Sequence, residues 1–279
     1  MSPIVFESEY ETLQPDNDPL LRASYWELAK GLQKTDGLDT SSYLEEVIAA
    51  TIDGSSSMQD ARTTLDRHYA GVSYGDPRSS EMEADKVSAR IVELLEKSTF
   101  QLSPVQLKSI HRFLFADIFP FDWVGQWRSE NIAKRQSVLG GRSVQYASFE
   151  DIDESVNYEM DRQRSRNYTL PLDAVQLSSL IAFTADLWLI HPFRDGNTRS
   201  ISTFLILYLK SLGISITNEP FAQDSEWFRN ALVRYNYVNL AAGIEADSTP
   251  LVMFFENLIF DTGHKLETFD LTCADIARS

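Results

Sequence analysis

The sequence contains a single cysteine, Cys273, and lacks any long apolar run. One cysteine excludes an internal disulfide and is typical of a reducing compartment. The longest apolar stretch, 201–209, is interrupted by a serine and a threonine and is far too short to cross a bilayer. The first residues lack the basic and apolar regions of a signal peptide. We therefore expect a cytoplasmic protein with no membrane partner.

Basic residues are scarce as well, because 25 Lys and Arg face 41 Asp and Glu, which leaves a formal net charge of −16. Such an acidic chain is a poor direct binder of nucleic acid, and we expect none as a partner. His68, His111 and His264 lie far apart without metal-ligand spacing, so they are expected to be core or surface residues. The sequence also has no glycine-rich lysine loop and no dinucleotide fingerprint.

Apolar residues make up 43% of the 279 positions, enough for one large domain or a domain with a small appendage. Their periodicity predicts a mostly helical chain. The helices are expected at 82–97, 104–115, 149–162, 174–190, 198–212, 224–239 and 248–261. Gly140 and Gly141 separate two short β-prone runs, which predicts a hairpin at 137–146. The fold class is therefore all-α with a small β-hairpin flap.

Composition also divides the chain along its length. Residues 1–20 carry three prolines among acidic residues and are expected to be extended. Short helical patterns follow at 21–70, and the glycine- and proline-containing segment 71–80 is typical of a linker. The main domain is expected at 81–262, with residues 263–279 as a C-terminal tail.

The most informative segment is the polar decapeptide 191–200, which lies between the apolar stretches 177–190 and 201–212. A helix that starts near Asn197 directs its unbonded N–H groups toward this segment, and such a helix start is a ready anion site. Gly196 allows the backbone to approach a phosphate closely. The pattern therefore indicates a phosphate-binding loop.

Three side chains add chemistry to this loop. Asp195 is a hard oxygen ligand suited to Mg²⁺, which usually binds one or two carboxylates together with substrate phosphates. Arg199 stands one turn into the helix and can donate two hydrogen bonds to phosphate oxygens. His191 can accept a proton near neutral pH.

The decapeptide resembles the signature of the Fic family, whose enzymes move part of a nucleotide onto a protein hydroxyl. That signature reads His-Pro-Phe-any-Asp/Glu-Gly-Asn-Gly/Lys-Arg and is often followed by a second arginine. The chain departs from it at Thr198 and at Ser202, where the second arginine would stand. The matching residues are His191, Pro192, Phe193, Asp195, Gly196, Asn197 and Arg199.

The resemblance implies a role for each part of the site. His191 would be the general base, Asp195 the magnesium ligand and Phe193 an inward-packed anchor of the nucleotide loop. The implied phosphate-binding residues are Arg194, Gly196, Asn197, Thr198 and Arg199. The helix at 227–236 would close over the base through Asn230, Tyr235 and Asn236. The implied flap that holds the target is made of Val138, Leu139, Gly140, Gly141, Arg142, Ser143 and Val144.

The activity implied by this resemblance is transfer of AMP from ATP, with Mg²⁺, onto a Ser, Thr or Tyr hydroxyl of a target protein. Self-modification is expected as well, and a homo-oligomer is compatible with the sequence. Two alternatives stay open. Because Thr198 departs from the signature, the group moved could instead be a phosphoryl group, UMP, GMP or phosphocholine. Because the second arginine is absent, a catalytically silent nucleotide-binding module is the other alternative.

The front segment 21–70 resembles the small helical antitoxins that partner some Fic toxins, through 31–38, 42–44 and the helix ending at His68 and Tyr69. In that family, Ser/Thr-three residues-Glu-Gly forms a brake in which the glutamate pairs with the second arginine. Here Leu32, Asp36 and Gly37 take those positions, and 49–54 is a weaker match. Since neither the glutamate nor the second arginine is in place, the usual clamp is not expected to form. The segment would either cover the site sterically or pack without inhibiting.

Overall fold

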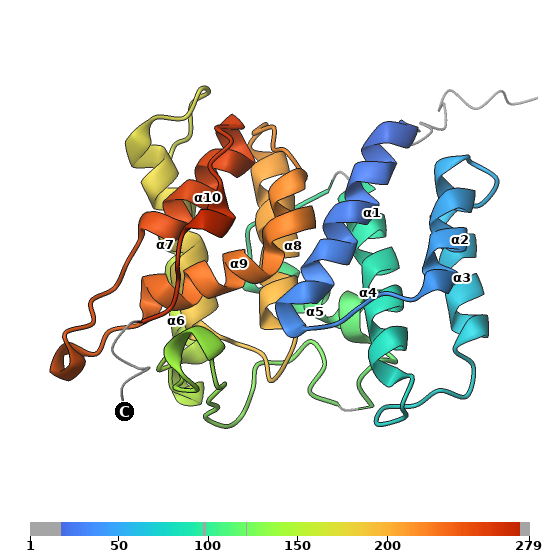
Figure 1. Ribbon diagram of the computed structural model, residues 1–279, viewed down its shortest axis with the longest axis horizontal. Coiled ribbons are helices and arrows are strands. Elements are labelled where there is room, and N and C mark those ends of the chain that lie inside the picture. Colours follow the sequence, from blue (N-terminus) through green and yellow to red (C-terminus); the bar gives the residue numbers. More distant parts are fainter. Residues whose placement is uncertain (1–17, 97–98, 121, 274–279) are drawn as a thin grey trace, which may run out of the picture.

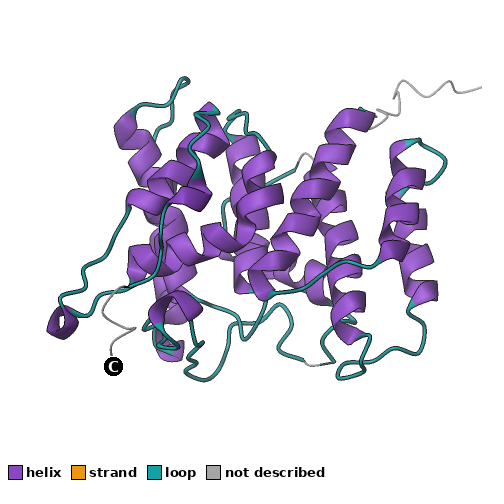
Figure 2. Ribbon diagram, in the orientation of Figure 1, coloured by secondary structure: helices purple, strands orange, loops and turns teal. Residues whose placement is uncertain are grey.

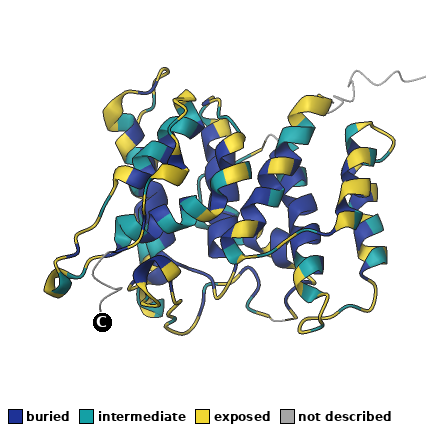
Figure 3. Ribbon diagram, in the orientation of Figure 1, coloured by how far each residue is buried: buried dark blue, intermediate teal, exposed yellow. Residues whose placement is uncertain are grey.

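Helix α8, Asn197–Ser211, lies in the core of the helical bundle (Figure 1). The computed structural model of the chain describes residues 18–96, 99–120 and 122–273. Every residue of α8 from Asn197 to Leu209 is buried, which gives this helix the dark core colour in Figure 3. Helices α1, α4, α5 and α7 all contact it. Since the loop 191–196 leads directly into α8, that loop is attached to a buried helix.

The described residues are helical with connecting loops and no β-sheet (Figure 2), which confirms the predicted all-α class. The helices besides α8 are α1 Pro19–Gln33, α2 Ser42–Ile52, α3 Met58–His68, α4 Ser79–Glu96, α5 Pro104–Phe115, α6 Ile152–Arg164, α7 Ala174–Ile190, α9 Glu219–Asn236 and α10 Thr249–Phe260. None of the helices in this described part is long and apolar enough to cross a membrane.

Local capping explains why α5 and α7 begin where the sequence predicts. The Ser103 hydroxyl accepts a hydrogen bond from the Gln106 N–H at 3.1 Å, and Pro104 occupies the first helical position of α5. At α7, Asp173 and Gln176 form a reciprocal capping box. These interactions satisfy N–H groups that a helix start leaves without partners.

The expected hairpin at 137–146 is wrong. A short 3-10 turn, Ser137–Leu139, replaces the first strand, and Gly140 follows it in a left-handed conformation with φ 59°. The turn is closed by Gln136, whose N–H donates to the Arg142 carbonyl and whose carbonyl accepts from Gly141, each at 2.9 Å. Two consecutive glycines can form a tight turn whether or not paired strands flank it. We call residues 138–144 the flap loop.

The front segment shares the hydrophobic core of the main domain. Helix α1 packs against both α4 and α9, while α2 and α3 form the outer flank beside α4 (Figure 1). The approach of α1 to α9 depends on Gly31, because a Cβ there would lie 2.1 Å from the Phe221 carbonyl oxygen. The predicted extended stretch 1–20 lies outside the described residues except for its last three positions, of which Pro19 already belongs to α1.

A buried carboxylate joins α4 to the loop before α2 and to the end of α3. Asp85 is fully buried and accepts hydrogen bonds from the Ser41 N–H at 2.8 Å and from the Tyr69 hydroxyl at 2.6 Å. Satisfying a buried carboxylate in this way fixes the position of the elements that supply its donors. The flank α2–α3 is therefore held to the bundle by polar as well as apolar contacts.

Candidate active site

Arg128 holds the loop between α7 and α8. Its side chain is buried and its guanidinium donates only to backbone carbonyl oxygens, at distances of 2.6 to 3.3 Å. The acceptors are Glu130, Ala147, Ile190 and His191. The backbone N–H of Arg128 also donates to the Pro192 carbonyl at 2.8 Å. Arg128 therefore holds the backbone at the end of α7, where the candidate base His191 stands.

His191 is buried at the end of α7 in a left-handed conformation, with φ 50° and ψ 59°. Its Nδ1 lies 3.2 Å from the Trp188 carbonyl oxygen, which can only accept. This hydrogen bond places the proton on Nδ1 and leaves Nε2 with a free lone pair. Burial lowers the pKa of His191 to about 3, so the ring is neutral at pH 7. A neutral imidazole with Nε2 free is the form that a general base requires.

Phe193 and His111 fix the middle of the loop. The two rings stack with centroids 3.8 Å apart. The Gly125 N–H donates to Nδ1 of His111, so Nε2 carries the proton and donates to the Asp195 carbonyl at 3.0 Å. Burial lowers the pKa of His111 to about 4. His111 is thus a core histidine, as the sequence predicts, and it also positions the loop.

The start of α8 is shaped by Gly196 and Asn197. Gly196 has φ 69°, and a Cβ on it would lie 2.4 Å from the Phe115 ring, so both its backbone and its surroundings require glycine. Asn197 makes two hydrogen bonds of 2.8 Å with the backbone of Phe193, accepting from its N–H and donating to its carbonyl. The asparagine side chain therefore closes the loop on itself.

The N-terminus of α8 faces a cavity of about 310 Å³. Within the described residues the first helical hydrogen bond runs from the Ser200 N–H to the Gly196 carbonyl, so the N–H groups of 197–199 have no partner inside the helix. Side chains of the loop, of the segment 130–134 and of the front segment line the cavity. The lining residues are Asp36, Glu130, Ile132, Ala133, Lys134, His191, Arg194, Asp195, Gly196, Asn197 and Thr198.

Two side chains of the loop point to protein partners. Arg194 is exposed and forms an ion pair with Glu130 at 2.9 Å. The Thr198 hydroxyl accepts a hydrogen bond from the indole Nε1 of Trp188 at 3.0 Å. The carbonyl of Trp188 also accepts the hydrogen bond from Nδ1 of His191. Trp188 therefore links Thr198, in the first turn of α8, to the candidate base.

The front segment reaches this site through an ion pair that differs from the usual clamp. Asp36 Oδ2 lies 3.0 Å from Arg199 Nε, although neither atom makes a well-aligned hydrogen bond among the described residues. Asp36 therefore pairs with the first arginine of the motif, and the second arginine is not needed. The weaker match does not take part, since Asp53 is exposed and accepts from the Ser55 N–H.

The Asp36 carboxylate lies where several positive groups converge. Its Oδ1 accepts a hydrogen bond from Lys134 Nζ at 2.7 Å. Burial opposes ionisation of Asp36, but the charges of Arg199, Lys134 and Arg229 outweigh it and lower the pKa to about 2. Asp36 is therefore ionised at all physiological pH values, and it occupies the place at which the site attracts an anion.

Arg199 is almost completely buried and has further partners. Its Nη2 donates to Glu83 Oε1 at 2.7 Å and its Nη1 donates to Gln33 Oε1 at 3.1 Å. Ser202, one turn further along α8, is buried and its hydroxyl has no partner in the described part of the chain. Each guanidinium nitrogen of Arg199 thus lies within about 3 Å of a protein oxygen, and two of these oxygens, on Asp36 and Gln33, come from the front segment.

Part of the chain that includes this site matches a known protein family. Residues 101–209 match the family model described as Fic/DOC family, and this range contains the loop and both helices that flank it. The chain contains a Fic/DOC domain. The matched range covers α5 to α8 and is narrower than the 81–262 expected from the sequence.

Two relatives of the Fic/DOC domain are informative. The chain is 27% identical over 111 residues to "Protein adenylyltransferase VbhT" of Bartonella schoenbuchensis, a match that covers 39% of this chain. It covers 21% of that protein, so the chain spans about a fifth of the length of this curated relative. A crystal structure of a Fic family protein from Desulfovibrio desulfuricans G20 aligns with a TM-score of 0.52 at 17% identity, covering 92% of this chain and 69% of that chain. This alignment shows a shared fold.

The structure places the three expected base-binding residues on α9, beyond the matched range. Asn230 is half-buried, and its Oδ1 has no partner within the described residues. Asn236 donates to the carbonyls of Ala185 and Leu232, which directs it toward α7. Tyr235 is half-buried, and the charge of Asp186, also on α7, acts on it. Of these three, none lines the 310 Å³ cavity.

The flap loop of the Fic/DOC domain has an apolar inner side and a polar outer side. Val138, Leu139 and Val144 are buried, Ser143 is half-buried, and Gly140, Gly141 and Arg142 are exposed. Arg229 on α9 donates to Gln136 Oε1 at 2.6 Å, which ties the base of the flap loop to the helix behind it. The outer side of the flap loop is therefore exposed to solvent.

The donor set fits magnesium bound together with substrate phosphates. Asp195 is an exposed carboxylate on the cavity wall, beside the unpaired N–H groups of α8. Among the described residues no three His, Cys, Asp or Glu side chains converge to hold a metal by themselves. Mg²⁺ is commonly held by one or two carboxylates with phosphate oxygens supplying the other ligands, and Asp195 is suited to that role.

Several residues of the site carry no sequence signal of their role. Arg128 and Lys134 precede the flap loop, and their partners are visible only in three dimensions. Gln33, Glu83 and Tyr146 lie more than 40 positions from the motif, and Tyr146 stacks on His191 with centroids 4.0 Å apart. Long-range pairs of this kind do not follow from periodicity or from a local motif.

Proposed function

We propose that this protein transfers the AMP moiety of ATP to a Ser, Thr or Tyr hydroxyl of a target protein. The observation that carries the proposal is the neutral His191, whose Nε2 is free in a cavity that also receives the N-terminus of α8. A base and an anion site are thereby combined within one cavity of 310 Å³, at the small end of the range for ligand pockets. The name of the adenylyltransferase relative supports the choice of AMP.

In the proposed reaction the target oxygen attacks the α-phosphorus of ATP while its proton passes to Nε2 of His191. The bond from the α-phosphorus to the bridging oxygen breaks, and pyrophosphate leaves with that oxygen. The N–H groups at the start of α8 stabilise the charge that develops on the phosphate. A positioned general base of this kind typically contributes ~10²–10⁴-fold to the rate.

Mg²⁺ fits this reaction through Asp195. When bound, it would neutralise charge on the phosphates and help to orient the leaving group. The residues of the chain have separate tasks. Arg128 and His111 keep the loop in register, and Tyr146 confines the His191 ring.

We further propose that the front segment restrains the activity. Asp36 is an anion that already neutralises Lys134 and Arg199, so nucleotide phosphates must compete with it for these cations. Gln33 adds a second contact from the same segment to Arg199. The restraint is therefore electrostatic as well as steric, and it is released when Asp36 leaves Arg199.

A different transferred group remains the second candidate, and Thr198 is the observation that favours it. In the Fic signature this position is Gly or Lys, whereas here the Thr198 hydroxyl is bound to Trp188. A side chain at this point narrows the cavity beside the phosphates and removes the cation that a lysine would supply. Both changes bear on which nucleotide or headgroup the site accepts.

Intact-mass spectrometry of the full-length protein after incubation with ATP and Mg²⁺ tests the proposal, because self-modification reports the chemistry without a known target. A gain of one AMP moiety is expected in the wild type, and it should be absent in His191→Ala. His264→Ala is the matched control, since His264 lies at the surface and pairs with Glu256. Calorimetric titration should show that His191→Ala still binds ATP.

The mass of the product also separates the candidates. A phosphoryl or UMP increment from the corresponding donor would replace AMP transfer by the second candidate. Binding of ATP without any increment in the wild type or in Asp36→Ala would contradict a transferase and support a silent binding module. Point variants are preferable to removing residues 1–70, because α1 shares the core with α4 and α9.

A further inference from the structure

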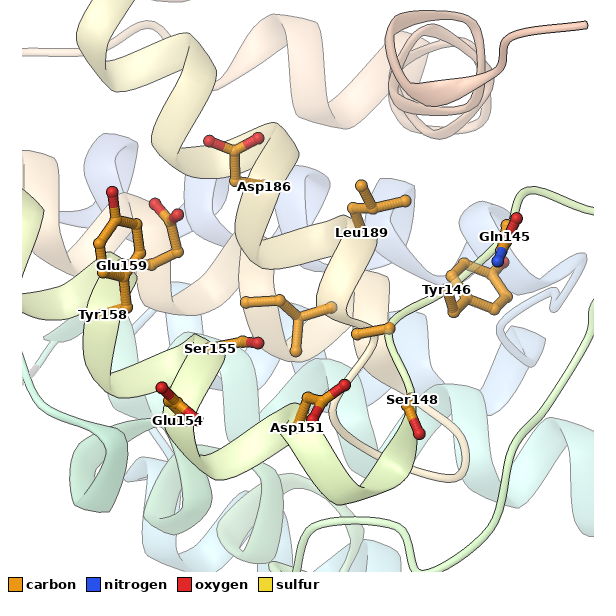
Figure 4. Close-up of a pocket in the computed structure, with 12 residues that line it drawn as sticks. Gln145, Tyr146, Ser148, Asp151, Glu154, Ser155, Tyr158, Glu159, Asp186 and Leu189 are labelled. Carbon is orange, nitrogen blue, oxygen red and sulfur yellow. The ribbon is translucent and has the colours of Figure 1, made fainter.

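A second cavity, of about 920 Å³ (Figure 4), lies beside the candidate active site and shares no lining residue with the nucleotide cavity. It runs between α6, the end of α7 and the segment 145–148, and we call it the acidic groove. Its lining includes no residue of the loop 191–199 and none of the front segment. The lining residues are Gln145, Tyr146, Ala147, Ser148, Asp151, Glu154, Ser155, Tyr158, Glu159, Asp186, Leu189 and Ile190.

The groove is lined by four carboxylates and by no lysine or arginine. Arg162, which does not line the groove, is shared between two of these acids. Its Nη2 lies 2.6 Å from Glu159 Oε2 and donates to Asp186 Oδ2, also at 2.6 Å. Asp151 and Glu154 are exposed further along the groove. The groove therefore retains negative charge after its internal ion pairs are counted.

The carboxylate of Glu159 can accept further hydrogen bonds. Its side chain is only 9% exposed, and Oε2 makes no well-aligned hydrogen bond among the described residues despite its contact with Arg162. Figure 4 shows Glu159 and Asp186 at one end of the groove and Tyr146 at the other. Burial and the neighbouring Asp186 raise the pKa of Glu159 to about 7, the behaviour of a carboxylate with too little positive charge around it.

The chemistry of the lining excludes two kinds of ligand. Carboxylates repel phosphates, so the groove does not extend the nucleotide site. The acids are also too dispersed for a metal ion, because no three metal-ligating side chains converge within the described residues. A cation on a long apolar stem fits instead, since Leu189, Ile190 and the exposed ring of Tyr158 can cover the stem.

The groove also reaches the candidate base. Tyr146 lines the groove, and its ring also stacks on the ring of His191, with the two centroids 4.0 Å apart. Ile190, the residue directly before His191, lines it as well. A peptide that presents a hydroxyl to His191 can therefore continue past Tyr146 and lay a neighbouring side chain in the groove.

We propose that the acidic groove binds an arginine side chain of the target protein, close in sequence to the hydroxyl that is modified. The inference rests on the proposed function, since it assigns the substrate class of that same site. Arginine fits better than lysine because its planar guanidinium can donate to Glu159 and Asp186 at once. The groove thus selects among exposed hydroxyls by the cationic residue beside them.

Peptide binding to the full-length protein without ATP tests this proposal. The probes are blocked peptides with one serine and one arginine, in which the arginine is placed at each flanking position in turn. Each has a partner peptide with citrulline, which keeps the shape and removes the charge. Charge-assisted hydrogen bonds predict that the best arginine peptide binds about tenfold more tightly than its citrulline partner, or more.

The double variant Glu159→Gln, Asp186→Asn should remove this preference, and Glu245→Gln, an exposed acid on another loop, should retain it. Circular dichroism confirms that each variant is folded. Equal affinity for arginine and citrulline peptides at every position would overturn the proposal, and so would a preference that survives in the double variant. Because neither ATP nor His191 is involved, this result is independent of the self-modification experiment that tests AMP transfer.

Discussion

The carboxylate of Asp36 lies 3.0 Å from the guanidinium of Arg199, and this contact joins the short 3-10 turn after α1 to the first turn of α8. Arg199 is the arginine of the motif that resembles the Fic signature, and its side chain is only 1% exposed. A buried ion pair is strongly disrupted by loss of one partner, because the other charge is left uncompensated. The pair therefore couples the position of the front segment to the state of the anion site.

Removing the Asp36 carboxylate should activate the protein and destabilise it at the same time. In Asp36→Ala, Lys134 and Arg199 become available to phosphate, and coupling of 1–3 kcal/mol between two sites predicts tighter ATP binding by about 5- to 150-fold. Self-modification should accelerate as well. Because Glu83 and Gln33 still contact Arg199, the loss of stability should be smaller than the ~3–5 kcal/mol of a fully broken buried pair.

Asp53→Asn is the matched control for this variant, because Asp53 stands in the weaker sequence match and is exposed. Its ATP affinity and self-modification rate should equal those of the wild type. Calorimetric titration and timed intact-mass spectra measure both properties. If Asp36→Ala binds ATP no more tightly than Asp53→Asn, the front segment does not restrain the site.

The protonation state of His191 can be tested directly by NMR. Burial lowers its pKa to about 3, so the neutral ring should persist from about pH 5 to pH 8, where an unperturbed histidine titrates near pH 6.5. The ring Cε1–H resonance, assigned by its loss in His191→Gln, should therefore hardly move over this interval. A titration midpoint between these limits would show that burial does not keep the ring neutral.

The helices and the loop could be predicted from the sequence, because both depend on local signals. Ser103-Pro104 and Asp173 mark helix starts through bonds that span only three residues. The polar decapeptide stands out because it interrupts two apolar stretches. The hairpin failed for the same physical reason, since Gly140 and Gly141 specify a tight turn and say nothing about whether strands pair beside it.

The Asp36 contact shows what local patterns do not contain. The sequence places Asp36 in a brake-like motif, but its partner depends on how α1 lies against α9 and α8. That placement depends on Gly31, where a side chain would collide with the Phe221 carbonyl. The interaction between Asp36 and Arg199 therefore results from packing between helices distant in sequence, and only the three-dimensional arrangement identifies it.

Arg128 should contribute more to stability than any exposed charge near the loop. Arg128→Met removes every guanidinium hydrogen bond to four backbone carbonyls, and hydrogen bonds to a charged group contribute about 1.5–3 kcal/mol each. We expect a loss of at least about 3 kcal/mol in urea unfolding. Arg194→Met is the control, because Arg194 and its partner Glu130 are each 55% exposed, and it should change stability by less than about 1 kcal/mol. Equal losses in the two variants would contradict the anchoring role of Arg128.

Gly196 is required both by its backbone conformation and by the ring of Phe115, and two alanine substitutions separate these causes. Gly243 has φ 68° with nothing within 4 Å of an added Cβ, so Gly243→Ala measures the left-handed conformation alone, roughly 1–2 kcal/mol. Gly196→Ala, with φ 69°, adds a contact of 2.4 Å to Phe115, and overpacking typically costs a further ~1–3 kcal/mol. Urea unfolding of both variants should therefore show the larger loss at Gly196.

Because Phe115 can relieve the clash only by displacing the start of α8, ATP binding should weaken in Gly196→Ala and remain unchanged in Gly243→Ala. Equal stability losses with intact ATP binding would mean that the loop adapts, and that the contact with Phe115 does not fix the anion site.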